Sequence, residues 1–134
     1  MDDLVNLFDS YLNSGVHHAA PGSDAVMLQE AAAAHGLEFI HIELRETTDK
    51  TCVLRMMGEA LECPEYFGMN WDALYDCLTD MSWRPAAGYV LHLAGLTLQD
   101  GTSHSTGETL ARVLDAAAGY WRGKEVPFYI ILVE

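Results

Sequence analysis

Basic residues are scarce in this chain. It has 7 Lys and Arg residues against 20 Asp and Glu residues, which gives a formal net charge of −13 at pH 7. Proteins that bind nucleic acid or an anionic membrane surface carry basic patches, so both kinds of partner are disfavoured. The negative charge favours a basic protein partner, and it is equally compatible with a purely solubilising role.

Cysteine is also rare, and its spacing shows no pairing. The three cysteines, Cys52, Cys63 and Cys77, are odd in number and form no C-x-x-C motif. A disulfide scaffold and a zinc knuckle are therefore disfavoured, and free thiols in a reducing cytosol are expected.

Long apolar runs are missing as well. No run approaches the length of a membrane span. The acidic start, Met1-Asp2-Asp3, lacks the basic and apolar regions of a signal peptide. We therefore expect a cytoplasmic protein that does not bind membranes.

The chain does contain enough apolar residues for one folded domain. Half of its 134 residues are hydrophobic, and a chain of this length buries about two-thirds of its unfolded surface. Strand-like and helix-like spacings of apolar residues alternate along it, which predicts an α/β fold with βαβ crossovers and a small parallel sheet. The predicted elements are a short helix over 3–13, a loop over 14–23, a helix over 24–35 with Gly36 as its C-cap, a strand over 39–44, a helix from 48 or 49 to 61, a helix within 64–79, a strand over 89–93, a helix from a capping box at 105–108 to about 121, and a fully buried strand over 128–133.

The most distinctive stretch is an acidic helix that follows Pro64. Its apolar residues recur at the i, i+3, i+4, i+7 spacing of a core-facing stripe, and these are Leu74, Cys77, Leu78 and Met81. Asp72, Asp76 and Asp80 recur at i, i+4 steps on the opposite side. Like charges at this spacing destabilise a helix by about 0.2–0.5 kcal/mol per pair, and Asp80 also lies near the negative end of the helix dipole. A cationic partner would explain the stripe, and a solvated surface is the alternative.

The segment PEYFGMNWDALYDCLTD, from Pro64 to Asp80, closely resembles the corresponding segment of the barstar family of ribonuclease inhibitors. The likeness extends in order from about Phe39 to Val133, and residues 1–36 lie outside it. The resemblance implies a three-stranded parallel sheet with helices packed around it. It also implies a barstar-like domain over 37–134, preceded by an N-terminal helical extension over 1–36.

The resemblance assigns acidic contacts to two or three residues. Asp76 matches the aspartate that enters the phosphate-binding pocket of the nuclease, and Asp72 matches a second acidic contact. A further acidic contact of the family lies on its long third helix. The ungapped match places Ala116 there, with Asp115 beside it as the candidate.

Aromatic and loop contacts follow from the same resemblance. Tyr66 matches a tyrosine at the rim of the interface, and Gly68 begins the loop that approaches the active site of the nuclease. Tyr75 stands where the family has a tryptophan. Trp83 corresponds to a second interface tryptophan, after an insertion of two residues.

The predicted mechanism is occlusion, with no chemistry of the chain's own and no cofactor. A ribonuclease site holds Lys, Arg and His side chains that bind phosphate. An aspartate on a rigid helix can occupy such a pocket through charge-assisted hydrogen bonds. The negative field of the chain would speed the encounter with a basic nuclease. We expect the free inhibitor to be a monomer.

Three alternatives remain at this point. The chain could be a barstar-like module that binds a basic protein other than a nuclease. It could be an enzyme that uses Cys77 with His92 or His41, although a nucleophilic cysteine needs an electropositive setting and this one is acidic. The carboxylates of the acidic helix could instead chelate a divalent cation, although they lack the loop geometry of calcium sites.

Overall fold

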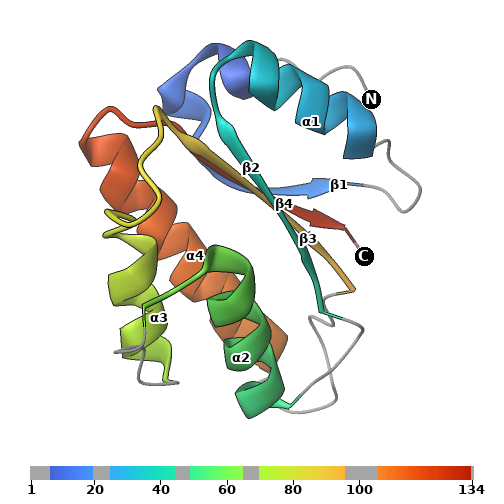
Figure 1. The fold of residues 1–134 in the computed structure, drawn as a ribbon, viewed down its shortest axis with the longest axis vertical. Helices are drawn as coiled ribbons and strands as arrows, with labels where there is room; N and C mark the ends of the chain where they lie inside the picture. The colour runs from blue at the N-terminus through green and yellow to red at the C-terminus, as the bar shows by residue number, and fades with distance from the viewer. Residues whose placement is uncertain (1–6, 20–24, 45–48, 65–69, 96–105, 134) are drawn as a thin grey trace.

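The computed structural model describes residues 7–19, 25–44, 49–64, 70–95 and 106–133. Helices and strands alternate along most of this part of the chain (Figure 1). The elements are the 3₁₀ turn η2 (Tyr11–Asn13), β1 (Gly15–Ala19), α1 (Ala25–Ala34), β2 (Glu38–Glu43), α2 (Lys50–Leu61), α3 (Trp71–Leu78), β3 (Tyr89–Ala94), α4 (Thr106–Gly123) and β4 (Phe128–Val133).

The strands form one parallel sheet in the order β1-β4-β3-β2. The predicted α/β class and parallel sheet are confirmed, but the sheet has four strands, so the expected number of three is wrong. The strand predicted to be fully buried is β4, which lies between β1 and β3, and its residues from Phe128 to Leu132 are all buried. A strand covered on both faces needs apolar residues throughout, as the sequence FYIILV supplies.

Helices cover both faces of the sheet, with α2, α3 and α4 on one side and α1 on the other (Figure 1). The larger core lies under α2, α3 and α4 and receives Ile42, Leu91 and Ile130 from the strands. The smaller core lies on the opposite face, where Tyr129 and neighbouring side chains pack against α1 and Phe8. Side chains alternate between the faces along each strand, so each strand contributes to both cores.

Several predicted helix boundaries are confirmed by their caps. Asp49 begins α2, because its carboxylate accepts the N–H of Thr51 at 2.9 Å. Gly36 follows α1 with a φ of +72°. This left-handed conformation is the one that favours glycine after a helix. The predicted capping box at 105–108 falls partly outside the described residues, since the description of α4 begins at residue 106.

The N-terminal predictions need two corrections. The segment predicted as a loop over 14–23 contains β1, which pairs with β4. Its sequence, GVHHA, lacks apolar alternation, so pairing with a neighbouring strand, not local pattern, makes it a strand. The described part of the helix predicted over 3–13 consists of two 3₁₀ turns separated by Ser10. The Ser10 side chain accepts the N–H of Leu12 and so competes with a continuous helix.

Residues 10–14 are joined to the C-terminal part of the fold by polar contacts. The hydroxyl oxygen of Ser14 accepts the backbone N–H of Phe128 at 2.9 Å, and the Ser14 carbonyl accepts from Arg122 at 2.6 Å. Tyr129 donates its hydroxyl to the Ser10 carbonyl at 2.7 Å. The division of the chain after residue 36 stays a prediction, and β1 and α1 share their sheet and core with the elements that follow.

We expect Ser14→Ala to lower the free energy of unfolding by about 1–3 kcal/mol, because it leaves the buried N–H of Phe128 without its acceptor. The exposed Ser82 provides the control, and Ser82→Ala should change stability by less than about 0.5 kcal/mol. Urea unfolding followed by circular dichroism measures both. Equal stability of the two variants would mean that β1 is not part of the cooperative unit that contains β4.

Candidate protein-binding site

The acidic helix is α3, and its two faces are as predicted. Leu74, Cys77 and Leu78 are buried, each with no more than 1% of its surface exposed. Asp72 and Asp76 are exposed on the other side. The helix is short, so its position depends on its burial and its ends more than on its own hydrogen bonds.

Both ends of α3 are fixed by side chains. Asn70 caps the N-terminus, where its amide oxygen accepts the N–H of Ala73 at 2.7 Å. At the C-terminus, the indole N–H of Trp121 on α4 donates to the Leu78 carbonyl at 2.7 Å. The Thr79 hydroxyl donates to the Tyr75 carbonyl at 2.9 Å. These contacts hold α3 against α4 and present its acidic side as a rigid surface.

The charges around α3 leave this surface negative. Asp72 lies in the first turn, where the helix dipole favours a carboxylate. In the described part of the chain, no ion pair includes Asp72, Asp76 or Asp115. Lys50 lies near the start of α3, with its ammonium 6.0 Å from the centre of the Trp71 ring.

The other predicted contact residues lie in different settings. Tyr75 is half-buried and packs against the larger core, so only part of its ring can reach a partner. Asp115 and the neighbouring Ala116 are both exposed on α4, the helix against which α3 packs. Tyr66 and Gly68 lie outside the described residues.

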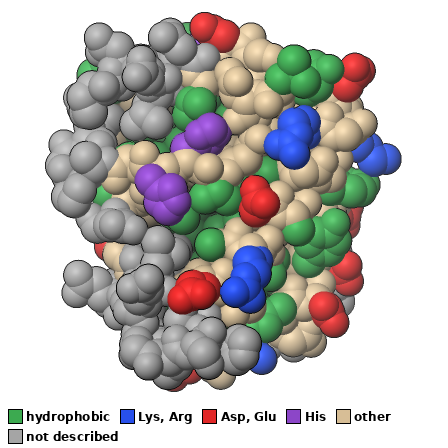
Figure 2. Space-filling view, turned by 180° about the vertical axis from the view of Figure 1, so that it is seen from behind, with side chains coloured by type: hydrophobic (Ala, Val, Ile, Leu, Met, Phe, Trp, Pro, Cys, Tyr) green, Lys and Arg blue, Asp and Glu red, His purple; other side chains and the backbone are tan. Residues whose placement is uncertain are grey.

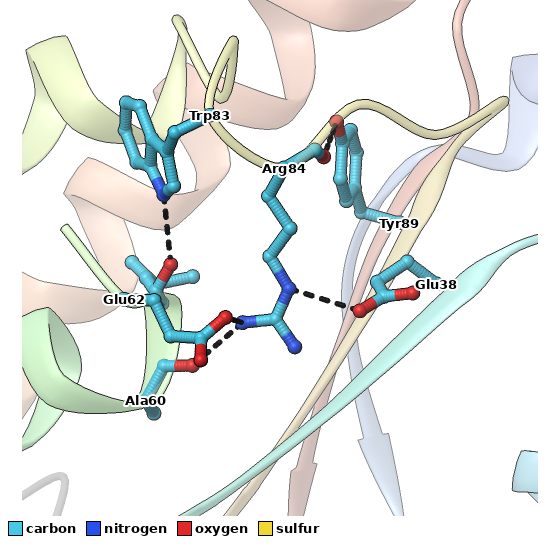
Figure 3. Close-up of polar contacts among 7 residues, drawn as sticks. Glu38, Ala60, Glu62, Trp83, Arg84 and Tyr89 are labelled. Carbon is cyan, nitrogen blue, oxygen red and sulfur yellow. Dashed lines mark hydrogen bonds and ion pairs between the residues drawn. The ribbon is translucent and has the colours of Figure 1, made fainter.

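Trp83 belongs to a cluster of polar contacts that ties the segment between α3 and β3 to the rest of the fold (Figure 3). Its indole N–H donates to the Leu61 carbonyl at 3.0 Å, at the end of α2. The next residue, Arg84, donates to Glu38 on β2 at 2.9 Å and to the Ala60 carbonyl at 2.9 Å. Trp83 therefore uses its donor within the chain.

Arg84 makes the largest share of these contacts, and no pattern in the sequence predicted its role in the fold. Its guanidinium also lies 3.3 Å from Glu62, and its carbonyl accepts the Tyr89 hydroxyl at 2.7 Å (Figure 3). The planar guanidinium group of Arg84 thus contacts Glu38 on β2 and both Ala60 and Glu62 at the end of α2. Its only signal in the sequence was that it is one of few basic residues in an acidic chain.

The structure separates the residues of the conceivable cysteine enzyme. Cys77 faces the core beneath α3. His41 and His92 lie on the opposite face of the sheet, since they alternate with Ile42 and Leu91, which point into the larger core.

Among the described residues, no group of three or more His, Cys, Asp or Glu side chains is placed to hold a metal ion. None of the described helices has the length and apolar character needed to cross a membrane.

The two histidines form a pair of their own. Their Nδ1 atoms are 2.9 Å apart, and Nε2 of His41 lies 3.4 Å from Glu43. A carboxylate only accepts hydrogen bonds, so a proton on Nε2 of His41 would favour the contact with Glu43, and His92 would then donate from Nδ1. Among the described residues, the buried Nε2 of His92 has no hydrogen-bond partner. Burial, with a contribution from His41, lowers the pKa of His92.

The view from behind differs from the acidic side of α3. Figure 2 shows basic and acidic side chains interspersed on that face, with histidine side chains among them. A surface of mixed sign does not select a strongly basic or acidic partner by its charge. This face therefore adds no electrostatic argument for a partner to the one based on α3.

A comparison with protein-family models matches residues 37–133 to the family described as Barstar (barnase inhibitor). The matched range begins just before β2, ends with β4 and contains α3. A search of curated proteins finds no match.

We expect Arg84→Lys to lower the free energy of unfolding by about 1–2 kcal/mol. Lysine keeps the charge but cannot reach Glu38, Glu62 and the Ala60 carbonyl together. Arg55→Lys is the matched control, since Arg55 is exposed on α2, and its effect should stay within about 0.5 kcal/mol. Thermal and urea unfolding measure the difference. A similar decrease in the free energy of unfolding in both variants would contradict a role for the planar guanidinium of Arg84.

We expect His92 to make stability depend on pH below about 6.5. The folded state lowers the pKa of His92, so the unfolded chain binds a proton first as the pH falls through its ordinary value near 6.5. The free energy of unfolding then decreases as the pH falls toward the lower folded pKa, by up to about 1.4 kcal/mol per pH unit. Above about pH 7 this contribution is constant.

The variant that tests this is His92→Asn, which retains a donor for His41 but does not titrate. Its free energy of unfolding, measured in urea at pH 5 to 7.5, should vary less with pH than that of the wild type. His18→Asn, at an exposed position of β1, is the matched substitution of a histidine outside the pair, against which the effect of His92→Asn is compared. A wild-type slope in His92→Asn would rule out His92 as the source.

Proposed function

Because this chain belongs to the barstar family, we propose that it is an inhibitor of a bacterial ribonuclease and that α3 blocks the active site of that enzyme. The observation that carries the proposal is the pair of exposed carboxylates, Asp72 and Asp76, on a helix whose opposite face is buried. The family description supplies the class of partner, and the geometry of α3 supports the mode of contact.

Asp76 is the central residue of the proposed contact. A ribonuclease needs cationic side chains and hydrogen-bond donors to hold the phosphate of its RNA substrate. The carboxylate of Asp76 offers two anionic oxygens in place of phosphate oxygens and forms charge-assisted hydrogen bonds with the same groups. Asp72 lies one helical turn earlier on the same side, so it reaches neighbouring cations about 5–6 Å away. No bond is made or broken in the inhibitor.

The rigidity of α3 favours tight binding. Its buried face and the contacts of Asn70 and Trp121 are made within the free chain. A surface that is already ordered loses little conformational entropy when a partner binds. The half-buried Tyr75 is likewise partly immobilised before contact. It would shield the neighbouring charge pairs from water.

The net charge of −13 assists the encounter. A basic ribonuclease is attracted over about one Debye length, which is roughly 8 Å at physiological ionic strength. The association rate should therefore fall as salt is added, while the dissociation rate changes less. In the cell that makes the ribonuclease, such an inhibitor would act in the cytoplasm as an immunity protein or antitoxin.

The test compares Asp76→Ala with Asp80→Ala, which removes the same charge four residues later. Wild type and both variants are immobilised and exposed to lysate and culture medium of the native cell, and the eluates are assayed for ribonuclease activity. We expect Asp76→Ala to raise the dissociation constant of the retained ribonuclease at least about 30-fold, as for the loss of about 2 kcal/mol or more from a buried charge pair. Asp80→Ala should change it less than about fivefold.

Each outcome decides between specific hypotheses. Retention of a ribonuclease by the wild type and Asp80→Ala, with loss in Asp76→Ala, supports both the function and the central residue. A ribonuclease bound equally by all three proteins would place the working surface away from α3. A retained basic protein without ribonuclease activity would favour the alternative function, a barstar-like module with a different partner.

A further inference from the structure

Strand β2 forms one end of the sheet, and in the described part of the chain its only paired neighbour is β3. The N–H of Glu38 donates to the Gly88 carbonyl at 2.9 Å, and the N–H of Leu44 donates to the Ala94 carbonyl at 2.9 Å. In a parallel ladder the N–H and C=O of one residue point to the same side, and successive residues alternate. The even-numbered residues of β2 therefore direct their backbone groups toward β3.

The odd-numbered residues of β2 direct their backbone groups to the open edge. These are Phe39, His41 and Glu43, and among the described residues none of their N–H or C=O groups has a hydrogen-bond partner. They span about 13 Å of extended chain. An edge with a row of unpaired backbone groups is a template for a further strand, and extended peptides bind to other proteins in this way.

A groove of about 460 Å³ lies beside this edge, between β2 and α2. Its apolar lining includes Ile42 from the strand and Met56 and Ala60 from the helix. The side chains of an added strand alternate between the two faces of the sheet, so every second one would enter the groove next to Ile42. The edge thus offers both backbone hydrogen bonds and a place for side chains, the combination that gives affinity and specificity in strand addition.

The charges at the groove favour a basic occupant. Glu43 of β2 and Glu59 of α2 line it together with Arg55. One oxygen of Glu43 lies 3.4 Å from Nε2 of His41, which leaves the other oxygen to accept from a lysine. The whole chain carries a net charge of −13. A second copy of this chain would bring the same charge and another Glu43 to the edge, so self-association there is disfavoured.

We propose that the edge of β2 binds an extended, basic segment of a protein partner as an additional antiparallel strand. Antiparallel pairing is the more stable arrangement per residue. In this arrangement the partner residues opposite Phe39, His41 and Glu43 place their side chains on the same face as these three, and the residues between them face the groove. The recognised segment therefore alternates lysine or arginine with an apolar residue.

This surface is separate from the acidic side of α3. Helix α2 contacts both β2 and α3 and lies between them (Figure 1). An added strand at the edge of β2 therefore leaves Asp72 and Asp76 accessible. Binding at this edge does not depend on the ribonuclease-inhibitor function, and each can be tested without the other.

The probe is a synthetic peptide, acetyl-Lys-Val-Lys-Val-Lys-Val-amide, titrated into the isotope-labelled full-length chain. Amide chemical shifts and hydrogen exchange are followed by NMR. In the free chain, we expect the amides of His41 and Glu43 to exchange faster than those of Ile40 and Ile42, which face β3. At a peptide concentration of about ten times the dissociation constant, exchange at His41 and Glu43 should slow about tenfold, while Ile40 and Ile42 change little.

N-methylated peptides test the backbone pairing without altering the protein. In the antiparallel arrangement, the lysine N–H groups face β2 and the valine N–H groups face solvent. Methylation of the three lysine N–H groups should raise the dissociation constant at least about tenfold, whereas methylation of the valine N–H groups should raise it less than about threefold. Equal affinities of the two methylated peptides, or the reverse order, would overturn the proposal.

Two substitutions at one position separate backbone from charge. Glu43→Pro removes an outward N–H at an edge position, where proline is tolerated, and should raise the dissociation constant about tenfold. Glu43→Gln removes only the charge and should raise it about two- to fivefold. Glu30→Gln, at an exposed position of α1, removes the same charge elsewhere and should change it less than about twofold. If Glu43→Pro fails to fold, the methylated peptides decide.

The contrary outcomes are equally specific. Chemical-shift changes confined to α3, or an equal effect of Glu30→Gln and Glu43→Gln, would show a general attraction between charges and overturn the proposal. Slower exchange at His41 with rising protein concentration, in the absence of peptide, would assign the edge to a second copy of the chain. An absence of saturable binding would likewise refute strand addition.

Discussion

The burial of β4 on both faces is the constraint on which the rest of the structure depends. A parallel strand with the sequence FYIILV must be covered from two sides, and its two edges must be paired. The cover comes from α2, α3 and α4 on one side and from α1 with Phe8 on the other. The position of α3 is thus a consequence of core packing, and its acidic side is what remains exposed once that packing is satisfied.

Because β4 is covered on both sides, the two faces of the sheet carry different groups of side chains. The face of α2, α3 and α4 holds the exposed carboxylates, and their supporting contacts come from Asn70, Trp121 and the Arg84 cluster. The opposite face holds the histidine pair and α1. Burial lowers the pKa of His92 in that pair. The exposed carboxylates of α3 and the histidine pair therefore lie on opposite faces of one sheet.

The sequence predicted most of the central fold because its local signals agree with the packing. Asp49 and Gly36 lie where helices begin or end, and β4 is apolar at every position. It did not predict β1, because GVHHA has neither alternation nor a β-branched run. Periodicity predicted the exposed side of the acidic helix with Asp72, Asp76 and Asp80, whereas the resemblance to the barstar family assigned Asp72 and Asp76 to the site. The cluster around Arg84 joins residues 46 positions apart, so no local pattern could reveal it.

The three tryptophans give the molecule an optical property that follows from their positions. Trp71 lies on α3, Trp83 donates to the end of α2, and Trp121 donates to the end of α3. All three pack against the larger core, and none contributes to the smaller one. The intrinsic fluorescence of the chain is therefore a local signal, which follows solvent access around the acidic helix and reports little on α1 and the first strand.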